Sequence, residues 1–141
     1  NEFSIRYSLN NGAFAILANN STVDQYNFGL RGTATTEFFP ETYTAPITNV
    51  LSAQYDIAES TRADEILPRV DGVLNQANPS GSASAGTGNF GNYPLFIGGR
   101  DNASLFFNGN LSSLIVRFGP NLSTSQIEAT EAWVNGKTGA Y

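Results

Sequence analysis

The chain of 141 residues contains no cysteine, no histidine and no methionine. Without cysteine it can form neither a disulfide nor a thiolate metal site. Without histidine it lacks the usual general base at neutral pH, the commonest zinc ligand and the usual activator of a nucleophilic serine. The absence of methionine leads us to expect a processed product or a piece of a longer protein.

Charged residues are also scarce, at 13% of the chain, and the net charge is −5. The seven basic residues are scattered singly, so no basic patch indicates a nucleic-acid partner. The apolar runs are too short to span a membrane, and we expect no membrane partner. The abundant residues are Asn, Ser, Thr and Gly with Phe and Tyr, a composition that favours β structure and an extracellular location. The length indicates one domain.

Alternating apolar and polar residues predict strands through the first half of the chain. The expected strands are residues 3–9, 13–18, 23–32 and 47–60. Residues 33–46 contain two prolines and are expected to form an edge strand or a loop. The apolar faces of two of these strands are Tyr26, Phe28 and Leu30, and Leu51, Ala53, Tyr55 and Ile57.

Residues typical of turns and loops predict a hairpin and a long loop in the middle of the chain. Asp71 and Gly72 predict a hairpin within residues 66–76. The small, Gly-rich residues 77–92 predict a long loop. Two apolar strands are then expected at 93–99 and 110–118, paired across a polar loop.

One helix is predicted near the C-terminus. Ser123 and Gln126 form a capping box at its start, and Gly136 is expected to be its C-cap glycine. Ile127 and Val134 are expected to cap the open end of the sandwich, with Trp133 packed between helix and sheet. The predicted fold class is therefore all-β: an antiparallel sandwich with one short C-terminal helix at its edge or rim.

The last third of the chain carries an ordered set of motifs. They are LFIGG (95–99), FNGNL (107–111), LIV (114–116) and a helix start formed by Leu122, Ser123 and Ile127. This order resembles the closing portion of a laminin-G-like, concanavalin-A-like jelly roll. Residues 86–100 and 133–141 resemble the versions at the C-termini of bacteriophage tail and prophage proteins. The resemblance covers residues 47–141 best and implies a single jelly-roll domain over 1–141, forming the C-terminal part of a longer chain.

The resemblance implies a non-enzymatic attachment module of a phage tail or virion, which recognises a host-surface glycan or mediates tail-protein assembly. The alternative is a purely structural capsid or tail decoration domain without a ligand. A glycoside hydrolase comes third, because the carboxylates form no paired array on one strand. The nearest acidic cluster is predicted to be a solvated turn: Asp56, Glu59, Asp64 and Glu65.

Loops 86–93 and 100–108 are expected to lie near each other if the strands at 93–99 and 110–118 pair, and they carry the aromatic and amide side chains that a sugar site requires. The alternative is that Phe90 and Tyr93 pack at the rim and the asparagines only form turns. The candidate glycan ligands are Asn89, Tyr93, Arg100, Asp101, Asn102 and Asn108. Asp101 is also a candidate calcium ligand, with an Asx turn as the alternative.

The chain is shorter than a complete domain of the family, so we expect an open edge that is paired in a homo-oligomer or with other tail proteins. A decoration module would instead bury its apolar edge strand, around Phe38 and Phe39, in a neighbouring chain.

Overall fold

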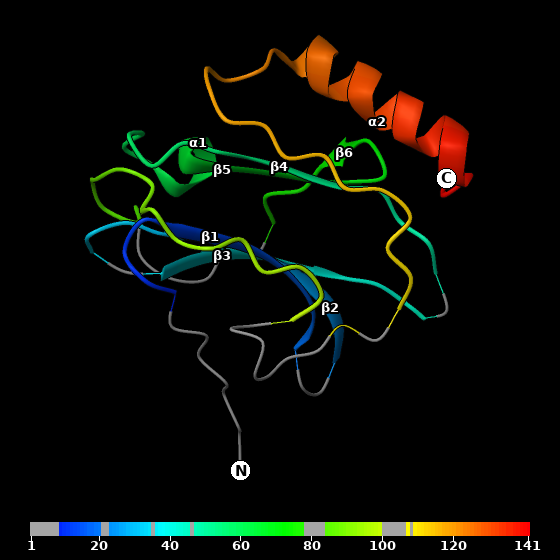
Figure 1. The fold of residues 1–141 in the computed structure, drawn as a ribbon, viewed down its shortest axis with the longest axis horizontal. Helices are drawn as coiled ribbons and strands as arrows, with labels where there is room; N and C mark the ends of the chain where they lie inside the picture. The colour runs from blue at the N-terminus through cyan, green and yellow to red at the C-terminus, as the bar shows by residue number, and fades with distance from the viewer. Residues whose placement is uncertain are drawn as a thin grey trace.

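The protein is represented by a computed structural model, in which the described residues are 9–20, 23–34, 36–45, 47–77, 84–99, 107 and 109–141. Within them the chain forms two small antiparallel sheets and a C-terminal helix (Figure 1). The expected β-rich fold with one C-terminal helix is confirmed at this level. The strand expected at residues 3–9 lies outside the described residues.

The first sheet, sheet A, contains three strands in chain order. They are β1 (Ala13–Asn20), β2 (Val23–Arg31) and β3 (Thr36–Thr42). Tyr26, Phe28 and Leu30 alternate along β2 and are all buried, as the sequence predicted. Pro40 lies in the edge strand β3 opposite Asn27 of β2. Proline has no N–H to donate, and in this edge strand no hydrogen bond to β2 is lost through its absence.

The second sheet, sheet B, also follows chain order. Its strands are β4 (Leu51–Tyr55), β5 (Ile66–Val70) and β6 (Val73–Leu74). The predicted hairpin is confirmed, because Asp71 and Gly72 adopt φ values of 51° and 80° between β5 and β6. The strand expected over 47–60 is shorter than predicted, and just before its start the Val50 N–H donates to the Asp71 carboxylate at 2.8 Å.

The two sheets face each other and enclose the core. Phe28, Leu30 and Ile66 are almost completely buried between them, and β4 adds the partly buried side chains of the predicted apolar face. The Tyr55 hydroxyl of β4 donates to the Ala15 carbonyl of β1 at 2.8 Å. Phe39, expected at an interface with a neighbouring chain, is instead only 3% exposed in this core. Pairing of β3 with β2 turns it inward.

A short helix, α1 (Arg62–Glu65), precedes β5 and was not predicted. Its N-cap is Thr61, whose hydroxyl accepts a hydrogen bond from the Asp64 N–H at 3.3 Å. The predicted solvated turn is wrong for Glu65, whose side chain is fully buried. Its carboxylate accepts bonds from the Ser84 hydroxyl and the Ala85 N–H, each at 2.8 Å at the closer oxygen, and these donors offset the cost of burying the charge.

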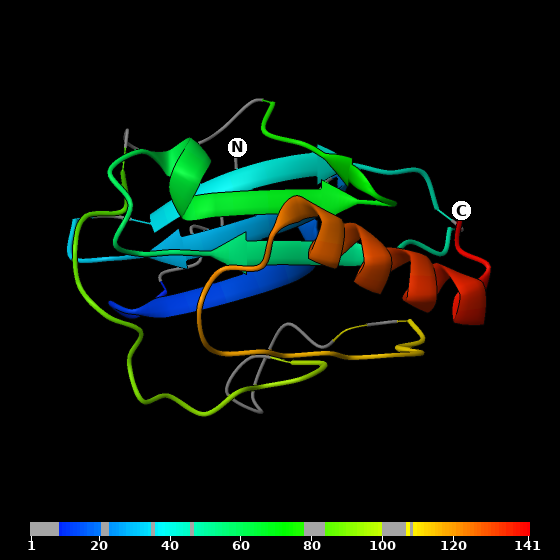
Figure 2. The ribbon, with the colours of Figure 1, turned by 90° about the horizontal axis from the view of Figure 1, so that it is seen from above.

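Helix α2 (Thr124–Thr138) forms a third layer over the outer face of sheet B (Figures 1 and 2). The predicted capping box of Ser123 and Gln126 is confirmed. The helix lies over the outer face of sheet B instead of capping the open end of the sandwich; Glu131 is its one buried residue, and Ile127 and Val134 are half-buried. Its C-cap is Gly139, with a φ of 63°, and not Gly136. The helix is therefore about one turn longer than expected.

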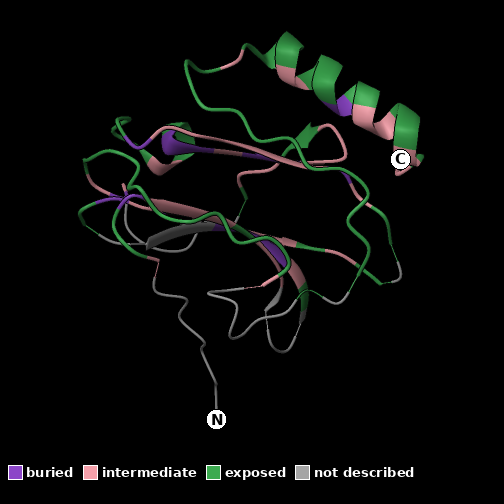
Figure 3. Cartoon of the chain, viewed as in Figure 1, coloured by how far each residue is buried: buried purple, intermediate pink, exposed green. Residues whose placement is uncertain are grey.

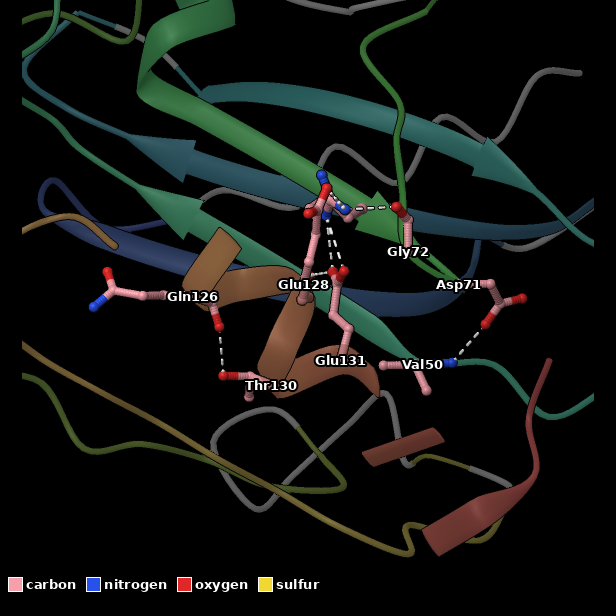
Figure 4. A network of polar contacts seen from close by, with 9 residues as sticks. Val50, Asp71, Gly72, Gln126, Glu128, Thr130 and Glu131 are labelled. Carbon is pink, nitrogen blue, oxygen red and sulfur yellow. Dashed lines mark hydrogen bonds and ion pairs between the residues drawn. The ribbon is translucent and has the colours of Figure 1, made fainter. Parts of the chain in front are cut away.

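A polar network attaches α2 to the sheet (Figure 4). Glu131 accepts bonds from Arg69 Nε at 2.9 and 3.1 Å and from the Ser52 hydroxyl. Hydrogen bonding to Glu131 is the main cause of the raised pKa of Arg69. Trp133 was expected beneath the helix but is 57% exposed, because it lies on the side opposite the Glu131 contact, with the Lys137 ammonium 5.8 Å from its ring centre.

The strands expected at 93–99 and 110–118 are not formed. Both segments run alongside the β1 and β4 edges of the sandwich (Figures 1 and 2) and are exposed along most of their length (Figure 3). Their apolar residues come in consecutive runs, so the pattern does not specify one buried face or a register. Among the helices of the described ranges, none combines the length and the apolar character needed to cross a membrane.

Candidate functional site

An open hollow lies where β1 begins and β2 ends. Its lining is polar apart from one leucine and carries one exposed aromatic ring. The lining residues are Leu9, Asn10, Asn11, Arg31 and Tyr93. They come from three separate parts of the sequence, so only the tertiary fold assembles the hollow.

Asn11 is the centre of the hydrogen bonding in this hollow. Arg31 Nε donates to the Asn11 side-chain oxygen at 2.9 Å, and the Tyr93 hydroxyl donates to the Asn11 carbonyl at 3.1 Å. These bonds orient the guanidinium and the tyrosine ring relative to the turn. Tyr93 remains 49% exposed, so part of its ring surface is accessible to a ligand.

Gly12 allows the loop that carries Tyr93 to approach the turn. Its φ is 79°, which a residue with a side chain rarely adopts. A Cβ atom at this position would lie 2.5 Å from the Asn89 carbonyl oxygen and 2.6 Å from the Gly91 nitrogen. The Gly91 N–H donates to the Gly12 carbonyl at 2.9 Å. The close backbone contact therefore depends on a glycine at position 12.

The same loop is anchored further upstream by backbone and core contacts. The Ala34 N–H donates to the Ala85 carbonyl at 3.0 Å, and the buried Glu65 carboxylate holds the Ala85 N–H. Phe90 packs edge-on against Phe14 of β1, with 5.8 Å between ring centres. These contacts place Asn89 and Tyr93 at one end of sheet A.

The structure describes two of the six candidate glycan ligands, Asn89 and Tyr93. The Asn89 backbone contacts Gly12, and Tyr93 lines the hollow beside it. The other four candidates, Arg100, Asp101, Asn102 and Asn108, lie outside the described residues. The expected proximity of loops 86–93 and 100–108 required pairing of the strands at 93–99 and 110–118, which are not formed, and all of the second loop except residue 107 lies outside the described residues.

The acidic side chains of the described ranges do not form a metal site. Asp56 accepts from the Ala58 N–H and from the Asn121 side chain, at 3.1 and 2.8 Å. Nowhere in these ranges do three metal-ligating side chains gather. The calcium ligand suggested by the sequence, Asp101, falls outside them.

Sequence reasoning missed Asn10, Asn11 and Arg31 as members of a site. Asn10 and Asn11 precede Gly12, a pattern that indicates only a turn, while Arg31 lies at the end of a strand. Their role in the hollow depends on contact with Tyr93, which lies 82 residues from Asn11 along the chain. No local pattern reports such a contact.

Comparison with known proteins identifies no relative of this chain. No family model matches it, and no curated protein or solved structure matches it at a significant level.

Proposed function

We propose that this chain is a non-enzymatic attachment module of a bacteriophage tail or virion, which recognises a glycan on the host surface. The observation that supports this function is the hollow of Asn11, Arg31 and Tyr93. An exposed aromatic ring beside amide and guanidinium groups is the combination that binds sugars. The sequence motifs of residues 47–141 resemble those of laminin-G-like jelly rolls, and residues 86–100 and 133–141 resemble the versions in phage tail proteins; this resemblance supports the proposed location.

A single hollow of this kind binds weakly, because it is open and makes few contacts with a sugar. Several copies on one particle would compensate for that weakness. Linking binding sites raises overall affinity by about 10²–10⁴ without any new contact. The proposed mechanism is therefore many weak contacts made together, with no bond formed or broken in the ligand.

Binding can be tested by probing an array of bacterial surface glycans with the chain displayed in multiple copies. Tyr93→Ala should weaken binding by more than about tenfold through loss of the ring face, whereas Tyr93→Phe should retain most of it. Tyr141→Ala is the matched control, because Tyr141 is exposed to 51% but lies outside the hollow. Equal losses for Tyr93→Ala and Tyr141→Ala, or no glycan bound by the wild type, would exclude this function.

A second candidate function is assembly of a tail or capsid structure, with or without a ligand. The observation that favours it is the exposed apolar character of residues 95–97 and 111–118. Monomeric proteins rarely expose apolar patches larger than a few hundred Å². On this view the chain serves as a structural or decoration module, and the same surface contacts another subunit.

A further inference from the structure

Glu65 is a buried carboxylate that does not line the hollow but is connected to it. Its side chain is fully buried at the end of α1, immediately before β5. Its backbone N–H donates to the Thr61 carbonyl, and its carbonyl accepts from the Asp56 N–H, each at 2.9 Å. The second of these bonds extends the pairing of β4 with β5 by one position. The place of the carboxylate is therefore set by sheet B.

The donors that reach this carboxylate come from one loop. The Ser84 hydroxyl donates to one oxygen and the Ala85 N–H to the other, each at 2.8 Å. Both donors are uncharged, and no ion pair joins Glu65 to a basic residue in the described part of the chain. If the loop moved away, the carboxylate would stay buried without these bonds, which is costly. The loop and the carboxylate therefore hold each other in place.

The same contact fixes the start of the loop against sheet A. Ala85 is completely buried, and its carbonyl accepts from the Ala34 N–H at 3.0 Å, just beyond the end of β2. The Thr33 N–H donates to the Thr87 carbonyl at 3.1 Å. The loop therefore starts from a position that is set jointly by Glu65 and by the end of β2.

The path from this anchor to the hollow is short. The Gly91 N–H donates to the Gly12 carbonyl at 2.9 Å, so only residues 86–90 lie between Ala85 and the next anchor. A short segment with both ends fixed keeps little conformational freedom, and releasing one end restores much of it. Tyr93 follows directly and depends on the same backbone for its place in the hollow.

We infer that Glu65 is a positioning residue of the hollow. Its buried carboxylate holds Ser84 and Ala85, and the place of these two residues sets the place of Tyr93. The coupling is reciprocal, because a ligand that holds the loop at the hollow also holds it on Glu65. The inference rests on the proposed glycan recognition for its effect on affinity, whereas its effect on the loop is measured without a ligand.

Glu65→Gln and Glu131→Gln form a matched pair of variants. Each replaces a carboxylate that is at most 2% exposed by an amide of the same size, but Glu131 contacts the outer face of sheet B, away from the loop. Hydrogen exchange is followed by NMR on the unliganded proteins. Glu65→Gln should speed exchange of the Ala85 and Gly91 amides at least about fivefold, and Glu131→Gln by less than about twofold, because these amides exchange through local opening of the loop.

The second readout is affinity for a glycan that the wild type binds on the array. Glu65→Gln should raise its dissociation constant at least about fivefold, whereas Glu131→Gln should leave it within about twofold. Saturating the wild type with that glycan should slow exchange of the Ala85 amide, although Ala85 lies outside the hollow. A purely structural role of Glu65 would produce neither effect.

Ser84→Ala and Ser84→Thr decide the question if Glu65→Gln does not fold. Only threonine keeps a hydroxyl that can donate to Glu65, so alanine should speed Gly91 exchange and threonine should not. Unchanged Gly91 exchange in Glu65→Gln or Ser84→Ala overturns the inference, as does equal acceleration in Glu65→Gln and Glu131→Gln. A wild type that binds no glycan overturns the attachment function alone, and Gly91 exchange then still decides whether Glu65 positions the loop.

Discussion

At the scale of single residues, one buried carboxylate holds helix α2 against sheet B. Glu131 is 2% exposed and is bonded to Arg69, which is 7% exposed. Removing one member of such a pair leaves the other charge buried without compensation. Glu128 also contacts Arg69, at 3.5 Å, but its side chain is 57% exposed and solvent screens the interaction.

Glu131→Gln should therefore lower the free energy of unfolding by about 3 kcal/mol. Glu128→Gln should change it by less than about 1 kcal/mol. Urea unfolding followed by far-ultraviolet circular dichroism measures both values. The two variants form a matched pair, because both glutamates lie on α2 and contact Arg69. Equal losses of unfolding free energy in the two variants would show that burial of Glu131 does not strengthen its contribution to stability.

At the scale of elements, two glycines near the end of α2 have opposite roles. Gly136 lies inside the helix, and Gly139 ends it with a φ of 63°. No atom lies within 4 Å of a Cβ built on either residue. Substitution by alanine at these positions therefore tests backbone conformation alone, free of steric clashes.

Gly136→Ala should raise the free energy of unfolding by about 0.5–1 kcal/mol, because alanine loses less backbone entropy in a helix. Gly139→Ala should lower it by about 1 kcal/mol, because alanine is strained at positive φ. Thermal unfolding should show Tm shifts of opposite sign, about 4 °C each. A lower Tm for Gly136→Ala would place the helix end at Gly136 after all.

At the scale of the whole molecule, burial of tyrosine side chains between the two sheets makes the stability of the fold depend on pH in the alkaline range. Burial, with smaller contributions from Tyr43, Asp71 and Asp24, raises the pKa of Tyr26 to about 12. Burial also raises the pKa of Tyr55. The Tyr26 hydroxyl donates to the Asn49 side chain at 2.8 Å, a bond that only the protonated group can make.

Stability should therefore fall as the pH rises through this range. An unfolded tyrosine ionises near pH 10, so the contribution of Tyr26 is complete below that pH and is lost between about pH 10 and 12. Each such tyrosine adds a slope of about 1.4 kcal/mol per pH unit. Denaturant unfolding at several pH values should show this decline, and Tyr26→Phe should make it shallower. A flat profile up to about pH 12 would contradict the expectation.

Local patterns in the sequence were sufficient to predict several elements of the structure. The alternation of Tyr26, Phe28 and Leu30, the turn at Asp71 and Gly72, and the capping box at Ser123 were each predicted in place. Each of these features depends on residues a few positions apart, whose backbone preferences and spacing are visible in the sequence.

Tertiary structure decided the rest. Burial of Glu65 and Glu131 depends on partners far along the chain, and an acidic residue by itself indicates exposure. The hollow at Asn11 needed contact with Tyr93, so of its members only Tyr93 was predicted. The apolar residues at 93–99 and 110–118 indicated strands but not the neighbours of those strands, because pairing between strands is non-local and a run of consecutive apolar residues sets no register.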